Sequence, residues 1–142
     1  MFKKEAKIMA AIVLTPLFLG LTAAFIVPKI FLNSCKNQIV ESYMSPDNKY
    51  EIILFLRDCG ATTGFSTQVS IIETGNELPN KGGNIFIADE GDTPVSLGSW
   101  GGPFVELKWI SQDKMIIEYP KASRIFKNEM QYKDIQIEYK KR

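Results

Sequence analysis

Hydrophobic patterning divides the chain into two parts. An apolar run without a charged residue extends from Ile8 to Pro28 and reads IMAAIVLTPLFLGLTAAFIVP. Beyond it, apolar and polar residues alternate over short segments separated by Gly, Pro, Asn and Asp, with no convincing helical period. We therefore predict an N-terminal membrane segment in residues 1–30 and a β domain in residues 31–142.

The apolar run is long enough to cross a lipid bilayer. A helix of about 20 residues, rising about 1.5 Å per residue, spans the roughly 30 Å of hydrocarbon. Pro16 and Gly20 are unfavourable in a soluble helix but are tolerated in a membrane helix. A buried helix of a soluble core is the alternative, and the remaining residues are too few to cover a helix that is apolar on every side. Residues 8–28 are therefore expected to contact the membrane.

Lysines predict the orientation of this segment. Lys3, Lys4 and Lys7 precede the run, and only Lys29 follows it closely. Under the positive-inside rule the N-terminus stays in the cytoplasm. We expect a single-pass protein of the inner (cell) membrane whose C-terminal domain lies outside the cytoplasm, in the bacterial envelope or periplasm.

Two alternatives to a retained anchor stay open. Cleavage of a signal peptide is compatible with the small residues Thr22–Ala24, although the apolar run is longer than the usual signal core. The residues Leu32–Ser34 before Cys35 loosely resemble a lipoprotein box, in which Asn33 fits poorly. In that case a lipid on Cys35 anchors the chain.

The remaining chain is predicted to be all-β. Tyr50–Leu56 is apolar on both faces and follows the turn Ser45–Asn48, as in a central buried strand paired with the preceding segment in a hairpin. The last segment alternates cleanly, as in a half-exposed edge strand, and Arg124–Tyr132 is expected to form at most a short helical turn. About seven antiparallel strands form a small sandwich or a bent meander, preceded by one N-terminal transmembrane helix. The strands are expected at residues 38–43, 50–56, 67–73, 83–89, 104–110, 114–119 and 135–140, with a hairpin turn at 111–113.

Cys35 and Cys59 are the only cysteines. In an oxidising compartment an isolated pair in a small domain usually forms a disulfide. A disulfide here ties the start of the β domain to the end of its first long strand. A lipidated Cys35 with a free Cys59, or two reduced thiols, are the alternatives.

Composition excludes several classes of function. The chain has no histidine, so it lacks the commonest general base and metal ligand. Its 17 Lys and Arg nearly balance its 16 Asp and Glu without forming a basic face, so nucleic acid is not an expected partner. No catalytic triad, carboxylate dyad or zinc site is visible. We predict no enzyme activity, no cofactor and no metal.

One loop is the candidate for ligand or partner binding. Residues 57–68 read RDCGATTGFSTQ, rich in hydroxyl groups and glycine but without the P-loop spacing. The alternative is a tight connection whose hydroxyls bond its own backbone. A second turn, Ser99–Pro103, carries a large aromatic residue that belongs either to the core or to a binding rim. The candidate binding residues are Thr62, Thr63, Phe65, Ser66 and Trp100.

Asp89, Glu90 and Asp92 form an acidic cluster around Gly91. Carboxylate oxygens at alternate positions suit calcium. The EF-hand spacing is absent, however, and a solvated acidic turn is much commoner, so no metal ligand is assigned.

Several of these motifs together resemble a family of small uncharacterised bacterial membrane or lipoprotein-like proteins. The family motif runs SPDGKY, an apolar strand, then RDCGATTGFSTQVSI, and the resemblance covers about residues 35–119. Asn48 replaces the usual glycine of the turn, which is acceptable because asparagine tolerates a left-handed backbone. The resemblance implies an envelope setting and, through the matching cysteines, the Cys35–Cys59 disulfide. It implies no activity.

Three functions are compatible with these features. The favoured one is a membrane-anchored extracytoplasmic binding module of unknown ligand, either an immunity-type protein or an envelope accessory protein with an envelope protein as partner. The alternatives are an envelope hydrolase that works without histidine and a structural subunit of a membrane complex. In the structural subunit, small residues such as Gly20, Ala23 and Ala24 pack against neighbouring helices.

Overall fold

A computed structural model describes Thr15 and residues 35–60 and 64–142. The chain divides into two compact units, residues 1–34 and 35–142. The predicted membrane segment, residues 8–28, and the predicted boundary near residue 30 lie outside the described residues, apart from Thr15. In the described part of the chain, no helix has the length and apolar character needed to cross a membrane.

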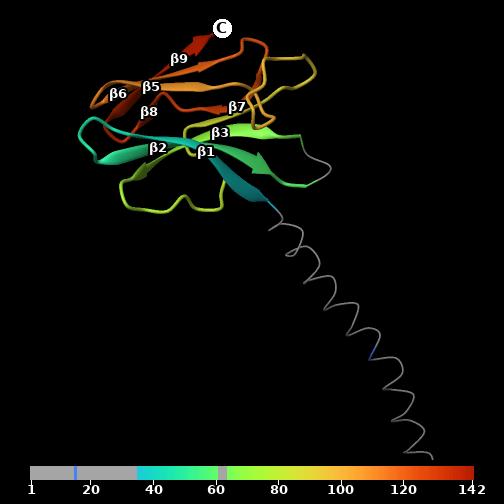
Figure 1. The fold of residues 1–142 in the computed structure, drawn as a ribbon, viewed down its shortest axis with the longest axis horizontal. Helices are drawn as coiled ribbons and strands as arrows, with labels where there is room; N and C mark the ends of the chain where they lie inside the picture. Colours follow the sequence, from blue (N-terminus) through green and yellow to red (C-terminus); the bar gives the residue numbers. More distant parts are fainter. Residues whose placement is uncertain (1–14, 16–34, 61–63) are drawn as a thin grey trace, which may run out of the picture. The chain divides into compact units, whose positions relative to one another are not determined.

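The described residues of the second unit form an all-β fold of two sheets (Figure 1). One sheet has the order β1-β2-β3-β4-β7 and the other the order β5-β6-β9-β8. The strands are β1 (Lys36–Met44), β2 (Tyr50–Asp58), β3 (Ser66–Glu73), β4 (Phe86–Asp89), β5 (Glu106–Ser111), β6 (Lys114–Tyr119), β7 (Arg124–Asn128), β8 (Gln131–Tyr132) and β9 (Ile135–Lys141).

The first sheet begins with the predicted hairpin of β1 and β2. Its turn is closed by Ser45, whose backbone N–H donates to the Tyr50 carbonyl at 2.8 Å. Asn48 adopts a φ of 58°, so the left-handed conformation expected at this position is confirmed. The register runs from Lys36 opposite Asp58 to Met44 opposite Glu51, with a bulge between Ile39 and Glu41.

The second sheet is mixed. β5 and β6 form the predicted hairpin, but β6 and β9 run parallel. The purely antiparallel prediction is therefore wrong at this pair, because the chain passes through β7 in the other sheet and through β8 before it returns as β9. β9 lies between β6 and β8, although β8 covers only Ile135 and Gln136 at its start, so β9 is not the edge strand that was expected.

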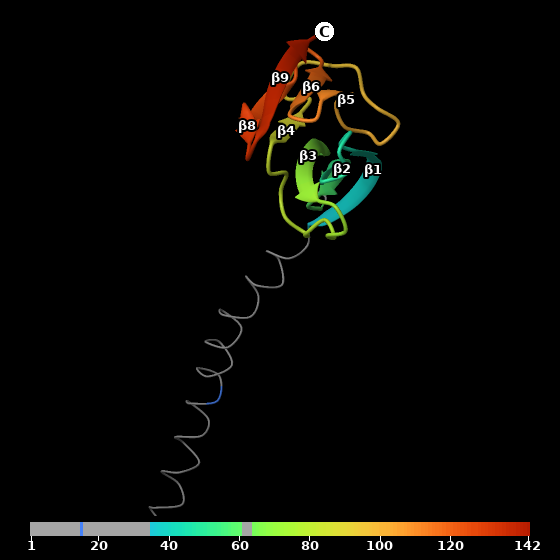
Figure 2. The same ribbon diagram turned by 90° about the vertical axis from the view of Figure 1, so that its left-hand side faces the viewer.

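The main core lies between the two sheets, which Figure 2 shows as two layers. Alternate residues of each strand face it, which gives the period of two seen in the sequence. The buried residues from the first sheet include Leu54, Val69 and Phe86, and those from the second include Met115 and Ile117.

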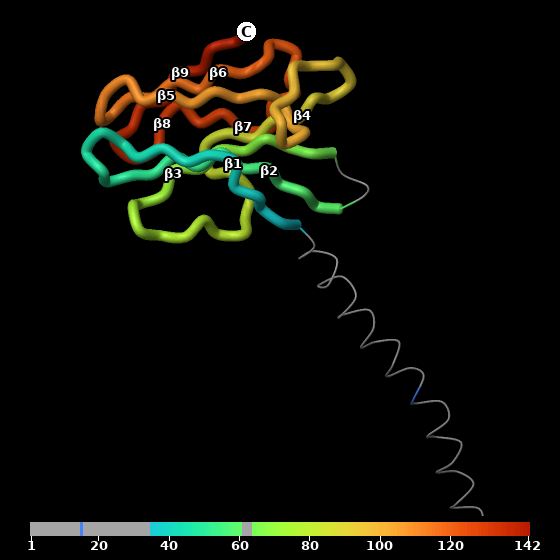
Figure 3. Tube along the Cα trace, viewed as in Figure 1, coloured from blue at the N-terminus to red at the C-terminus, as the bar shows by residue number. Residues whose placement is uncertain are grey.

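A second, smaller cluster covers the outer face of the first sheet. Ile53, Phe55 and Ile72 point away from the main core and pack under Leu78. Leu78 belongs to the loop between β3 and β4, which runs along this face (Figure 3). β2 is therefore buried on both faces, as its continuous apolar pattern predicts.

The segment Arg124–Tyr132 is not a helical turn, contrary to prediction. Its exposure alternates over Arg124–Asn128, and Ile125 packs against the main core. Pairing with β4 decides the conformation of this short, weakly patterned segment. With β7 and β8, the described residues contain nine strands, against about seven predicted.

Candidate functional site

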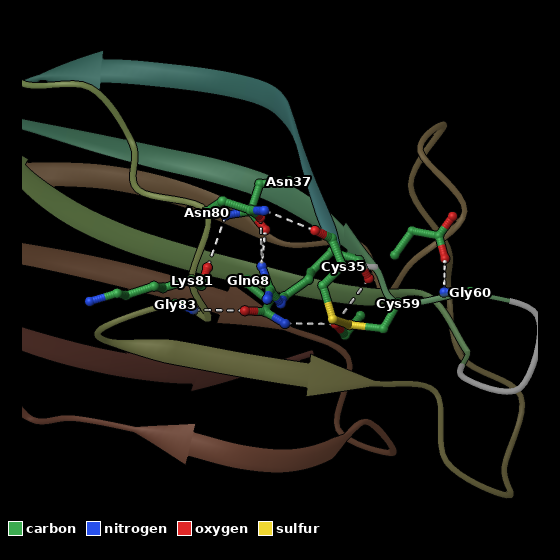
Figure 4. The surroundings of a disulfide bond; sticks show 11 residues. Cys35, Asn37, Cys59, Gly60, Gln68, Asn80, Lys81 and Gly83 are labelled. Carbon is green, nitrogen blue, oxygen red and sulfur yellow. Dashed lines mark hydrogen bonds between the residues drawn. A yellow bond between two sulfur atoms is a disulfide. The ribbon is translucent and has the colours of Figure 1, made fainter. Parts of the chain in front are cut away.

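The disulfide Cys35–Cys59 is confirmed, with 24 residues of separation (Figure 4). The register explains the pairing, because Lys36 lies opposite Asp58 and the next positions outward are Cys35 and Cys59. The bond therefore closes the open end of the β1–β2 hairpin and fixes Cys59, the third residue of the candidate loop.

A polar network holds the β3–β4 loop against this end of the hairpin. Arg57 donates to the side-chain oxygens of Asn37, at 2.5 Å, and Asn80, at 3.2 Å. The Asn80 amide in turn donates to the carbonyl of Cys35 at 3.0 Å, and the Asn37 amide donates to the carbonyl of Lys81 at 2.9 Å (Figure 4). These bonds fix the loop to β1 and β2 at one end of the sheet.

The Ser66 hydroxyl is engaged in hydrogen bonds next to this polar network, at the start of β3. This hydroxyl accepts from the Gln68 amide at 2.7 Å and lies 3.4 Å from the carbonyl of Arg57. The Gln68 carbonyl oxygen accepts the N–H of Gly83 at 2.7 Å. Neither partner of the Ser66 hydroxyl is a base able to take a proton from it.

Trp100 is half-buried and packs on the opposite face of β3. Its indole N–H donates to the Thr67 hydroxyl at 2.9 Å, and this hydroxyl donates to the carbonyl of Pro103 at 2.7 Å. The indole also stacks on Phe104, with ring centroids 6.0 Å apart. Because neighbouring residues of a strand point to opposite faces, Thr67 with Trp100 and Ser66 with Gln68 lie on different sides of β3.

Phe65 lines a hollow of about 290 Å³, here called the Phe65 hollow. A Cβ atom built on Gly101 would lie 3.2 Å from the Phe65 ring, so the glycine lets the ring approach the Trp100 turn closely. The φ of Gly101 is 88°, which also favours glycine there. The hollow is lined by Gly64, Phe65, Asp89, Glu90, Gly91, Leu97, Gly101, Pro103 and Arg124.

A charged pair forms one wall of this hollow. Arg124 on β7 donates through Nε to Asp89 Oδ1 at 2.9 Å and through Nη2 to Asp89 Oδ2 at 2.6 Å. The hydrogen bond and charge of Asp89 raise the pKa of Arg124. Asp89 Oδ1 also accepts the N–H of Gly91 at 2.9 Å, which orders the acidic turn. The guanidinium carbon lies 5.1 Å from the ring centroid of Phe126, a cation–π contact.

The structure brings only some of the predicted residues together. Phe65 lines the hollow and the Trp100 turn borders it, whereas Ser66 faces the other side of the sheet. Thr62 and Thr63 lie outside the described residues. Sequence reasoning missed Leu97, Arg124 and Phe126. The alternation of Arg124–Asn128, read as a strand, would have placed Arg124 and Phe126 on an exposed face.

Within residues 35–60 and 64–142, no three His, Cys, Asp or Glu side chains are placed to hold a metal ion. Asp89 of the acidic cluster is engaged by Arg124 instead. Comparison with protein-family models, with curated proteins and with solved structures finds no match to this chain.

Proposed function

We propose that this protein is a membrane-anchored, extracytoplasmic binding module that recognises a protein partner in the bacterial envelope. It has no catalytic role in this proposal. An immunity-type protein, which binds a toxin, and an accessory protein of an envelope complex are the two forms that fit a small anchored domain of this kind.

The observation that carries the proposal is a group of exposed apolar side chains around Arg124. Phe65 is 49% exposed, Leu97 49% and Phe126 60%. The first two line the hollow with Arg124, and the third lies under its guanidinium group. Aromatic residues and arginine dominate the binding energy of protein interfaces, and gathered apolar groups on a surface mark such sites.

The envelope setting is supported by two independent features. The Cys35–Cys59 disulfide is a kind of bond that persists in oxidising compartments and is rare in the cytosol. The charge-free run of residues 8–28, preceded by lysines, has the length of a membrane-spanning helix and the flanking charge of one whose N-terminus lies in the cytoplasm.

Photo-cross-linking in intact cells tests the binding surface. A photoreactive amino acid replaces Phe65 or Leu97, and the control position is Ile110, which is 50% exposed. Ile110 lies beside the Pro46–Lys49 turn, at the other end of β2 from Phe65, so the probe is equally accessible but differently placed. We expect one discrete adduct of the same mass from positions 65 and 97, lost when Arg124→Glu is added. Adducts of equal yield from Ile110 would contradict the proposal.

Cysteine labelling tests the orientation separately. Thr93→Cys places an extra thiol on an exposed turn, and Lys4→Cys places one before the apolar run. A membrane-impermeant maleimide added to intact cells should label Thr93→Cys and leave Lys4→Cys unlabelled until the cells are lysed. The opposite result places the β domain in the cytoplasm and removes the envelope setting.

A further inference from the structure

β1 has a free edge along its whole length. Among the strands that the structure describes, it is the terminal strand of the first sheet and pairs with β2 alone. Its backbone N–H and C=O groups on the other side are available to another strand. The bulge at Val40 and the charged residues Lys36 and Glu41 limit non-specific pairing, and they leave two straight segments, Lys36–Ile39 and Glu41–Met44.

A groove lies on the outer face of the first sheet, over β1 and β2. Its volume is about 550 Å³, and the β3–β4 loop forms its far wall. Ile39, which is 56% exposed, lies opposite Phe55 of the outer cluster and therefore projects to this face. Ile39, Ile53 and Leu78 give the groove an apolar middle.

The two ends of the groove carry opposite charge. At one end, Glu51 lies opposite Met44. The β3–β4 loop starts near the same end, because the Thr74 N–H donates to the Lys49 carbonyl, and Glu77 follows soon after in this loop. Lys36 lies at the other end, where Asn80 bonds the Cys35 carbonyl. None of these three charged groups forms an ion pair with another residue that the structure describes. The groove thus offers an acidic end, an apolar middle and a basic end.

We propose that β1 and this groove bind an extended segment of a partner protein by strand addition. The added strand runs antiparallel to β1, in keeping with every other pair in this sheet. It carries a basic residue near its N-terminus, apolar residues at alternate positions in its middle and an acidic residue near its C-terminus. The basic side chain then reaches across the Met44 end of β1 toward Glu51 and Glu77, the apolar ones pack beside Ile39, and the acidic one lies beside Lys36.

A pair of synthetic peptides tests the charge order on the full chain in detergent micelles. The first is Lys-Thr-Ile-Thr-Ile-Thr-Glu, and the second has its Lys and Glu exchanged. Both peptides have uncharged, capped ends and carry the same fluorophore. Fluorescence anisotropy should show roughly fivefold tighter binding of the first, since each exposed ion pair contributes only a fraction of a kcal/mol. Equal affinity for the two peptides would overturn the proposal.

A charge-reversal variant provides the matching change in the protein. In Glu51→Lys combined with Glu77→Lys the preference between the peptides should invert. Glu129→Lys combined with Asp92→Lys makes the same change in net charge on exposed residues away from the groove, and it should leave the preference unchanged. A preference that follows net charge in both variants would overturn the site.

Backbone methylation distinguishes strand addition from side-chain binding alone. In an added strand, alternate N–H groups face β1 and the others face solvent. N-methylation of one alternate set in the first peptide should abolish binding, and methylation of the other set should leave it. Equal effects of the two sets would overturn strand addition. Sedimentation showing a dimer that the peptide dissociates would also overturn the choice of occupant, in favour of a second copy of this chain.

Discussion

Trp100 donates its indole N–H to the hydroxyl of Thr67 at 2.9 Å, a contact between residues 33 positions apart. The same hydroxyl donates to Pro103, so a single buried oxygen attaches the turn of residues 99–103 to the first sheet. That turn supplies Gly101 and Pro103 to the Phe65 hollow. The hydrogen bond between Trp100 and Thr67 therefore helps to position the proposed binding surface without belonging to it.

The first prediction concerns Thr67→Val. The substitution keeps the shape of the side chain but leaves the Trp100 N–H and the Pro103 carbonyl without their bond, at a cost of about 1–3 kcal/mol in the free energy of unfolding. Urea unfolding, followed by tryptophan emission, measures it. Thr93→Val, in an exposed turn, is the control and should change stability by less than about 0.5 kcal/mol. Equal stability of the two variants would show that the buried bond contributes nothing.

The second prediction concerns the disulfide. Replacing both cysteines with serine removes a cross-link between residues 24 apart and should lower the free energy of unfolding by roughly 3 kcal/mol. A reductant should lower the unfolding midpoint of the natural chain and leave that of Cys35→Ser combined with Cys59→Ser unchanged. If the reductant has no effect on the natural chain, the cross-link does not stabilise the fold.

Much of this fold follows from the sequence because strand periodicity is local information. Tyr50–Asp58 is apolar on both faces, and the structure buries both faces, one against the other sheet and one under Leu78. The disulfide was predictable because only two cysteines exist. β7 was missed because five residues of alternating pattern are too few to outweigh a competing helical interpretation, and pairing with β4 determines their structure.

The candidate site was predictable only in part, because it is assembled from distant segments. Phe65, Leu97 and Arg124 come together only once β4 lies between β3 and β7. No local pattern specifies that order of strands. Trp100 could be singled out from the sequence, but its role could not, because an aromatic residue in a glycine-rich turn fits a core position as well as a binding rim. Its contact with Thr67 is not apparent from the sequence.

The third prediction concerns pH and Asp47, in the turn between β1 and β2. The hydrogen bond from the Ser45 hydroxyl, followed by the contact with Lys49, lowers the pKa of Asp47 from 3.8 to about 2. A carboxyl with a lowered pKa in the folded state stabilises the fold above its unfolded pKa and loses this effect as the pH falls. Asp47→Asn should therefore be less stable than the natural chain at pH 6, and the difference should shrink as the pH falls from about 4 through about 2.

Thermal unfolding at pH 6, 4 and 2 measures this difference. Asp92→Asn removes one negative charge from another exposed turn and controls for the change in net charge. A difference between Asp47→Asn and the natural chain that is as large at pH 2 as at pH 6 would contradict the assigned role, because at pH 2 about half of the Asp47 carboxyls in the folded state are protonated.

The last prediction concerns Gly83, where the β3–β4 loop passes close to two strands. A Cβ atom at this position would lie 2.6 Å from the Phe86 carbonyl oxygen and 2.8 Å from that of Val69. Both are backbone atoms of paired strands, so neither can move without disturbing the sheet. Gly83→Ala should lower the free energy of unfolding by about 1–3 kcal/mol, as overpacking does in well-ordered interiors.

Gly64→Ala, where a Cβ meets nothing within 4 Å, is the matched control and should leave the unfolding midpoint nearly unchanged. Equal midpoints for the two variants would show that the loop shifts to accept the methyl group, and the wall of the groove beside β1 would then be less rigid than strand addition requires.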